Sequence, residues 1–179
     1  MAAAYESELE RLLDQARALL GAGDDALLVQ ANLAVNQALQ LHPDAVAAWL
    51  LKCQIASATG DDLAALASVE MALHRAPHLP EALYWRGAVL GDLGRPREAL
   101  RAIEAAFRVL AGEDHWLVED LWFEKVSLLD ALGLHEAAVA AVAAGLERCP
   151  GSPLLRAALA PAERARVRGS LKVLRGGAG

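Results

Sequence analysis

Aromatic residues, isoleucine and threonine are scarce in this chain of 179 residues, and the shortage argues against a β-sheet fold. Trp, Tyr and Phe make up 4% of the sequence, whereas 55% of all residues are hydrophobic, most of them Ala, Leu and Val. Sheets favour aromatic and β-branched side chains, but Ala and Leu are strong helix formers and Ala lets helices approach closely. The composition predicts an all-α protein of ordinary domain size.

The chain also lacks an excess of positive charge and any cysteine pattern. The formal net charge is −6, which makes nucleic acid an unlikely partner. Cys53 and Cys149 lie far apart and outside any CxxC motif, so we expect free thiols in a reducing compartment. The N-terminal residues carry acids where a signal peptide has a basic start, and no apolar run has the length of a transmembrane helix. We predict a cytoplasmic protein, and the Ala-rich, Arg-over-Lys composition suggests a bacterial source.

Enzyme signatures are missing as well. The chain has no GxGxxG motif, no GxSxG motif and no P-loop. His74 and His78 have the spacing of a helical metal pair, but Pro77 lies between them at a predicted helix end, and no acid or cysteine cluster completes a site. Cys53 occupies a small-residue packing position, where we expect it to be buried and inert. The sequence therefore predicts no catalytic activity, no cofactor and no metal.

A repeat of about 34 residues runs through the chain, and Pro43 and Pro77 mark its period. The segments 46–77, 80–111 and 119–150 align without gaps. Each has a large residue near its start, a glycine eleven residues later, an alanine five residues beyond that glycine, and a small residue seven further on. In order, these positions are Trp49, Leu83 and Trp122; Gly60, Gly94 and Gly133; Ala65, Ala99 and Ala138; and Ala72, Ala106 and Gly145.

The pattern resembles the tetratricopeptide repeat (TPR), with its W-x2-L-G-x2-Y, A-x3-F and P positions. Glycine at the end of the first helix allows a left-handed cap, and small residues on the second helix allow close crossing. The resemblance implies an α-solenoid of antiparallel helix pairs with a C-terminal capping helix. The expected units are about 5–43, 46–79, 80–113 and 119–152, in a repeat domain of residues 1–160 that precedes a basic helix and flexible tail at 161–179.

Two local features depart from the repeat. Pro161 is expected to separate a helix at 153–160 from another at 162–174, because proline disrupts a helix interior. An insertion at 114–118 contains Trp116, which either projects as an apolar loop or folds back onto the helices.

In TPR proteins the first helix of each unit lines a concave groove that binds a partner. Transferred to this sequence, the groove has an apolar stripe, a floor of small residues and an acidic rim, which suits an amphipathic helix or peptide with basic flanks. The alternative is that the apolar members pack against neighbouring helices. The groove residues are Leu50, Gln54, Glu81, Tyr84, Trp85, Ala88, Asp120, Phe123 and Ser127.

A basic strip of Lys52, Arg86 and Lys125 contributes one cation to each unit. It either binds a carboxylate or phosphate, or its members pair with acids on neighbouring helices. The family's carboxylate clamp for chaperone tails needs Lys and Asn at groove positions. Because Leu50 and Tyr84 stand there instead, we do not expect clamp-type co-chaperone activity.

The sequence therefore predicts a non-catalytic adaptor or scaffold that binds another protein or peptide. Two alternatives are a client-specific chaperone or secretion-associated protein, and an anion-binding module that contacts nucleic acid or acidic lipid through its basic C-terminal segment. Self-association also stays open. The basic residues of the C-terminal segment are Arg164, Arg166, Arg168, Lys172 and Arg175.

Overall fold

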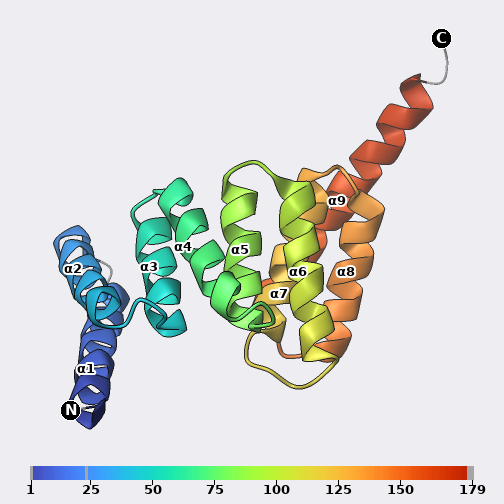
Figure 1. Ribbon diagram of the computed structural model, residues 1–179. Coiled ribbons are helices and arrows are strands. Elements are labelled where there is room, and N and C mark those ends of the chain that lie inside the picture. The colour runs from blue at the N-terminus through green and yellow to red at the C-terminus, as the bar shows by residue number, and fades with distance from the viewer. Residues whose placement is uncertain (1, 23, 177–179) are drawn as a thin grey trace. The chain divides into compact units, whose positions relative to one another are not determined.

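The computed structural model describes the backbone of residues 2–22 and 24–176, and side chains between residues 6 and 166 except residue 23. Within this part the chain forms nine α-helices and no strand (Figure 1), which confirms the predicted all-α class. None of the described helices combines the length and apolarity needed to cross a lipid bilayer. The helices are α1 (Ala2–Gly21), α2 (Asp25–Leu41), α3 (Val46–Ala58), α4 (Asp62–Arg75), α5 (Pro80–Asp92), α6 (Pro96–Leu110), α7 (Val118–Ala131), α8 (His135–Arg148) and α9 (Pro153–Gly176).

The chain divides into two compact units, unit 1 (Met1–Leu93) and unit 2 (Gly94–Gly179). In unit 1, α3 contacts both α1 and α5, so these three helices form one layer. Helices α2 and α4 pack against them as a second layer, in contact with the helices that flank them in the chain. In unit 2, α7 contacts α6, α8 and α9, and α8 also packs against α9. Each unit therefore stacks consecutive helices in the manner of helical repeats.

Helix ends follow the repeat chemistry that the sequence predicts. Gly60, Gly94 and Gly133 all adopt left-handed backbone, with φ of +75°, +69° and +72°. The segment 80–111 ends in Ala111 where the other two aligned segments end in proline, and Ala111 is itself left-handed, with φ of +47°. At the starts of helices, the Asp24 and Asp61 carboxylates accept hydrogen bonds from the Ala26 and Ala64 N–H groups. These caps satisfy backbone groups that have no partner within the helix.

Small residues form the contacts between helices. The alanines at the repeat positions are completely buried, and Cys53 takes the same role on α3. At Gly145 on α8, an added Cβ would lie 2.9 Å from Leu155 Cδ1 and 3.1 Å from Trp122 Cβ. The predicted close crossing of helices is therefore present at this position. The buried repeat alanines are Ala65, Ala72, Ala99, Ala106 and Ala138.

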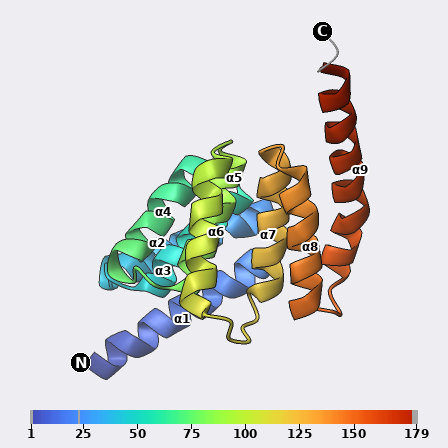
Figure 2. The ribbon, with the colours of Figure 1, turned by 90° about the vertical axis from the view of Figure 1, so that its right-hand side faces the viewer.

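The predicted helix break at Pro161 is wrong. Helix α9 runs without interruption from Pro153 to Gly176, with Pro161 inside it (Figure 2). Leu155 before the proline and Ala162 after it are both buried. Because α9 packs against α7 and α8 on both sides of Pro161, burial offsets the backbone hydrogen bond that proline cannot make.

Candidate partner-binding site

Unit 1 places the predicted groove residues of α3 and α5 on adjacent helices of one layer. Leu50 and Gln54 lie on α3, Tyr84 and Ala88 lie on α5, and all four side chains are half-buried. Glu81, at the start of α5, is half-buried as well. The two helices therefore present partly accessible apolar, aromatic and polar groups from one layer.

Leu50 and Trp85 are only partly accessible, because each also packs into the core. Both pack against the buried cluster that contains Cys53 and Val69. The Trp85 ring also meets the Tyr84 ring edge to face, with centroids 5.6 Å apart. Packing accounts for much of Leu50 and Trp85, as the alternative interpretation expects, so Tyr84 is the better probe of partner binding in unit 1.

Helix α7 of unit 2 carries the remaining groove residues. Phe123 is 37% exposed, more than its apolar character favours in a folded core. Asp120 is half-buried one turn earlier, and burial, followed by the charge of Glu119, raises the pKa of its carboxyl. The Ser127 hydroxyl donates to the Phe123 carbonyl oxygen at 3.1 Å and so bonds its own helix.

The basic strip is engaged within each unit. The Lys52 ammonium donates to Asn36 Oδ1 at 2.9 Å, and the Arg86 guanidinium pairs with Glu70 at 2.7 Å. Lys125 lies over the ring of Trp122, 5.5 Å from its centroid, and near the Phe107 ring. Arg86 therefore shows the pairing with an acid that the sequence analysis gives as one alternative, whereas Lys52 contacts an amide and Lys125 contacts aromatic rings.

In unit 2, the rings of Phe107 and Trp122 pack against each other, with centroids 4.8 Å apart. A cavity of about 430 Å³ opens over them, with Lys125 and Arg108 as cations and Glu104 as a carboxylate in its lining. The alignment uses Trp122 only as the large residue near the start of its segment, so the sequence does not predict this cavity. The signal in the sequence is the presence of one aromatic residue on each of two consecutive helices, Phe107 on α6 and Trp122 on α7.

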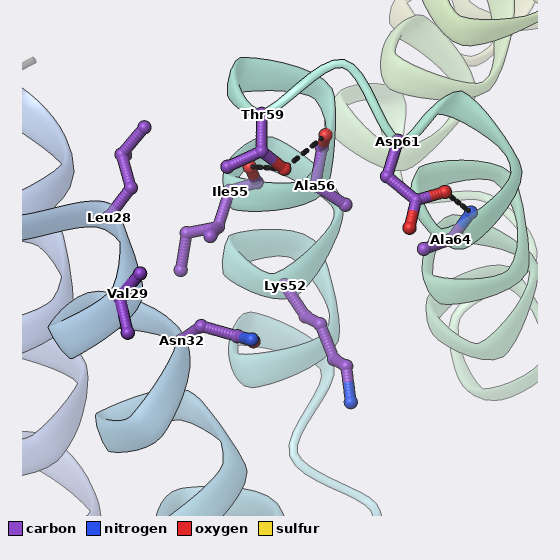
Figure 3. Close-up of a pocket in the computed structure, with 9 residues that line it drawn as sticks. All are labelled: Leu28, Val29, Asn32, Lys52, Ile55, Ala56, Thr59, Asp61 and Ala64. Atoms are coloured by element: carbon purple, nitrogen blue, oxygen red, sulfur yellow. Dashed lines mark hydrogen bonds between the residues drawn. The ribbon is translucent and has the colours of Figure 1, made fainter. Parts of the chain in front are cut away.

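Unit 1 contains another cavity that sequence reasoning missed. It has a volume of about 200 Å³ and lies among α2, α3 and α4 (Figure 3). Leu28 and Ile55 contribute apolar walls, and Asp61 lies at one end. The sequence does contain a signal for this site, because α2 carries exposed Val29 and Leu33 one turn apart. We refer to this site as the α2–α4 cavity.

The insertion at 114–118 projects as an ordered loop. Trp116 is 69% exposed, whereas Leu117 is completely buried and anchors the loop. The Arg148 guanidinium donates to the carbonyl oxygens of Gly112 at 2.6 Å and Glu113 at 3.4 Å. Of the two alternatives for Trp116, the structure therefore shows the projecting loop, fixed at both ends.

The basic C-terminal segment is only partly described. Arg166 on α9 lies 3.6 Å from Glu136 on α8, which ties this part of the helix to unit 2. The side chains of Arg168, Lys172 and Arg175, and the glycine-rich end, lie outside the described residues.

Groups that could perform chemistry are few in the described part of the chain. No cluster of three or more His, Cys, Asp or Glu side chains there could hold a metal ion. Burial raises the pKa of the Cys53 thiol to about 12, which keeps it protonated at neutral pH.

Solved structures with a similar fold are TPR proteins. The chain matches the crystal structure of MamA with a TM-score of 0.73 and 17% identity, over 94% of this chain and 87% of that chain. It matches a thermophilic TPR protein of Thermus thermophilus with a TM-score of 0.73 and 22% identity, over 86% and 80% of the two chains. YrrB, described as a TPR protein with an unusual peptide-binding site, matches with a TM-score of 0.67 and 19% identity, over 91% and 84%. By sequence, no family model and no curated protein matches.

Proposed function

Because the chain has the tetratricopeptide-repeat fold, we propose that it is a non-catalytic adaptor that binds another protein through the first helices of its repeats. The bound element is a peptide or a helix, and the mechanism is complementarity of shape and charge without a chemical step. A fold of this kind supports many functions, so the proposal rests on the exposed residues of the binding face.

The observation that carries the proposal is the accessibility of aromatic side chains on first helices. Tyr84 on α5 is half-buried, and Phe123 on α7 is 37% exposed. Large aromatic side chains that stay accessible are typical of the residues that dominate protein–protein binding energy. Both lie at positions that the TPR pattern assigns to the binding face.

Charge supports a basic partner. Residues 1–93 contain five Lys and Arg against twelve Asp and Glu, a formal charge of −7, whereas residues 94–179 carry +1. Glu81 and Asp120 place carboxylates one turn before Tyr84 and Phe123. A partner with Lys or Arg beside its apolar residues would therefore gain affinity and association rate at unit 1.

A pull-down from lysate of the native cells tests this function. Wild type, a Tyr84→Ala, Phe123→Ala variant and a Trp116→Ala control serve as baits, and captured proteins are identified by mass spectrometry. We expect one partner on wild type and on the control but not on the double variant, because only that variant loses aromatic groups of the binding face. Overlapping peptides of that partner, tested by fluorescence anisotropy, then locate the bound segment.

Circular dichroism melting of each bait keeps the result interpretable. A double variant that melts like wild type and retains the partner at full affinity would refute binding through these first helices.

A further inference from the structure

The α2–α4 cavity lies on the side of α3 that faces away from the proposed binding residues. Lys52, Ile55 and Ala56 of α3 line the cavity. With 3.6 residues per turn they point opposite to Leu50 and Gln54. The cavity is therefore a site separate from the one proposed above, formed by the second helices of two repeats and the first helix between them.

Size and lining suit an apolar side chain. The volume of about 200 Å³ exceeds that of an apolar cavity of about 150 Å³ known to accept benzene. Figure 3 shows Leu28 and Val29 of α2 on one side and Ile55 of α3 facing them. A leucine, isoleucine or methionine side chain would be desolvated on several sides there.

The surface of α2 beside the cavity is unusual for a soluble helix. Val29 and Leu33 are 62% and 59% exposed, and Leu63 at the start of α4 is 72% exposed. The only charged residue of α2 is Asp25. By contrast, most of the exposed residues of α6 are charged. Those of α6 are Arg97, Glu98, Arg101, Glu104 and Arg108.

The charged residues around the cavity indicate which kind of partner it would bind. Asp61 lines one end, next to Asp62, and Asp24 and Asp25 begin α2 one turn before Leu28. The only cation in the lining, Lys52, already donates to Asn36 at 2.9 Å. Acids at one end and a satisfied cation at the other favour a positively charged partner.

We propose that the α2–α4 cavity and the adjoining Val29, Leu33 and Leu63 surface dock a basic amphipathic helix of a partner protein. One aliphatic side chain of that helix enters the cavity, and its apolar stripe covers Val29 and Leu33. A Lys or Arg one turn away pairs with the carboxylates that begin α2 and α4. This surface adds a second binding face to the adaptor and does not depend on the first.

A designed peptide tests the proposal without knowledge of the natural partner. The probe is a fluorescein-labelled helical peptide of about 18 residues with leucines on one face and lysines beside them. A matched peptide has glutamate in place of every lysine. Fluorescence anisotropy measures the affinity of both for wild type, Val29→Lys/Leu33→Lys and Leu134→Lys/Leu154→Lys. The last variant adds the same charge at exposed apolar positions of unit 2.

We expect the basic peptide to bind wild type and the unit 2 variant, and to bind Val29→Lys/Leu33→Lys at least about tenfold more weakly. Tyr84→Ala should keep full affinity, and the glutamate peptide should bind more weakly than the lysine peptide. Because Val29 and Leu33 are largely exposed, their substitution should leave the melting temperature near that of wild type.

Any of the following results would overturn the proposal. They are no binding of the basic peptide to wild type, equal binding to a folded Val29→Lys/Leu33→Lys variant, equal binding of the two peptides, and a wild-type dimer in sedimentation that this variant dissociates. The last result would make a second copy of the chain the occupant. If Tyr84→Ala alone lost affinity for the peptide, the peptide would bind the first helices of the repeats. The proposal of a second binding face would then fail, while the proposed function would stand.

Discussion

Gly145 lies against the Trp122 side chain so closely that a Cβ at Gly145 would be 3.1 Å from Trp122 Cβ and Cγ. Trp122 cannot retreat freely, because its ring also packs against Phe107 with centroids 4.8 Å apart. The contact of α7 with α8 therefore depends on the absence of one methyl group.

Substitution of that glycine should destabilise the fold. Gly145→Ala gains about 1 kcal/mol of helix propensity, but overpacking a core costs about 1–3 kcal/mol, so we expect a lower free energy of unfolding. Urea denaturation followed by circular dichroism measures the difference. Gly21→Ala is the matched control, since an added Cβ there meets nothing within 4 Å. Equal stability of Gly145→Ala and wild type would show that the Trp122 contact is not limiting.

Removal of the Arg148 side chain should release the projecting loop. Arg148→Ala deletes the hydrogen bonds to the Gly112 and Glu113 carbonyl oxygens, a loss of about 1 kcal/mol at an exposed site. Chymotrypsin should then cleave after exposed Trp116 faster than in wild type, which mass spectrometry can follow. Arg101→Ala on α6 is the control and should cleave at the wild-type rate. An unchanged rate in Arg148→Ala would mean that buried Leu117 alone fixes the loop.

The two thiols should differ in reactivity. Cys53 is fully buried, with a pKa raised to about 12 by burial. Cys149 is half-buried, and burial, followed by the charge of Glu119, raises the pKa of its thiol. Because the thiolate is the reactive form, Ellman's reagent at about pH 8 should label Cys149 slowly and Cys53 only after unfolding in guanidinium. Cys149→Ser should abolish labelling of the folded protein, and rapid labelling of folded Cys149→Ser would contradict the burial of Cys53.

Stability should depend on pH through Asp92. Burial, followed by the charge of Asp62, raises the pKa of the Asp92 carboxyl in the folded state. A raised folded pKa favours the protonated form, so the stability that this group contributes is present at low pH and is lost as pH rises through the folded pKa.

Asp92→Asn should therefore raise the melting temperature at pH 7 and leave it unchanged near pH 3, below the ordinary aspartate pKa of about 3.9. Thermal melts from about pH 3 to pH 8 check this. A melting temperature of Asp92→Asn below that of wild type at neutral pH would contradict this prediction, because it would show that the charged carboxylate stabilises the fold.

Residues that recur in the repeat could be predicted from the sequence. Gly60, Gly94 and Gly133 share one backbone conformation because one position in each repeat ends its first helix. Cys53 is buried because the same register places it in the core. A periodic pattern fixes such positions, since neighbouring repeats meet in the same geometry each time.

Features outside the repeat could not be predicted in the same way. Pro161 follows the last aligned segment, so only its low helix propensity was available, and packing of α9 overrides that propensity. The α2–α4 cavity arises where side chains of three helices fail to fill their shared space, and periodicity does not report volume. The partner-binding residues on the first helices of the repeats remain predictions, because exposure shows which side chains are accessible and does not identify a partner.

Helix α9, which contains Pro161, has two segments with different resistance to opening. Proline has no N–H to donate to the Ala157 carbonyl, so the helix lacks one internal hydrogen bond at that turn. Leu155 before the proline and Ala162 directly after it are both buried and anchor the helix in unit 2, whereas the last turns extend beyond the ends of α7 and α8 in Figures 1 and 2. Amide hydrogens of these last turns can therefore exchange with solvent through local fraying that leaves the anchored turns closed. The terminal segment can lose or change its conformation without loss of the repeat stack, and so can be remodelled independently of the rest of unit 2.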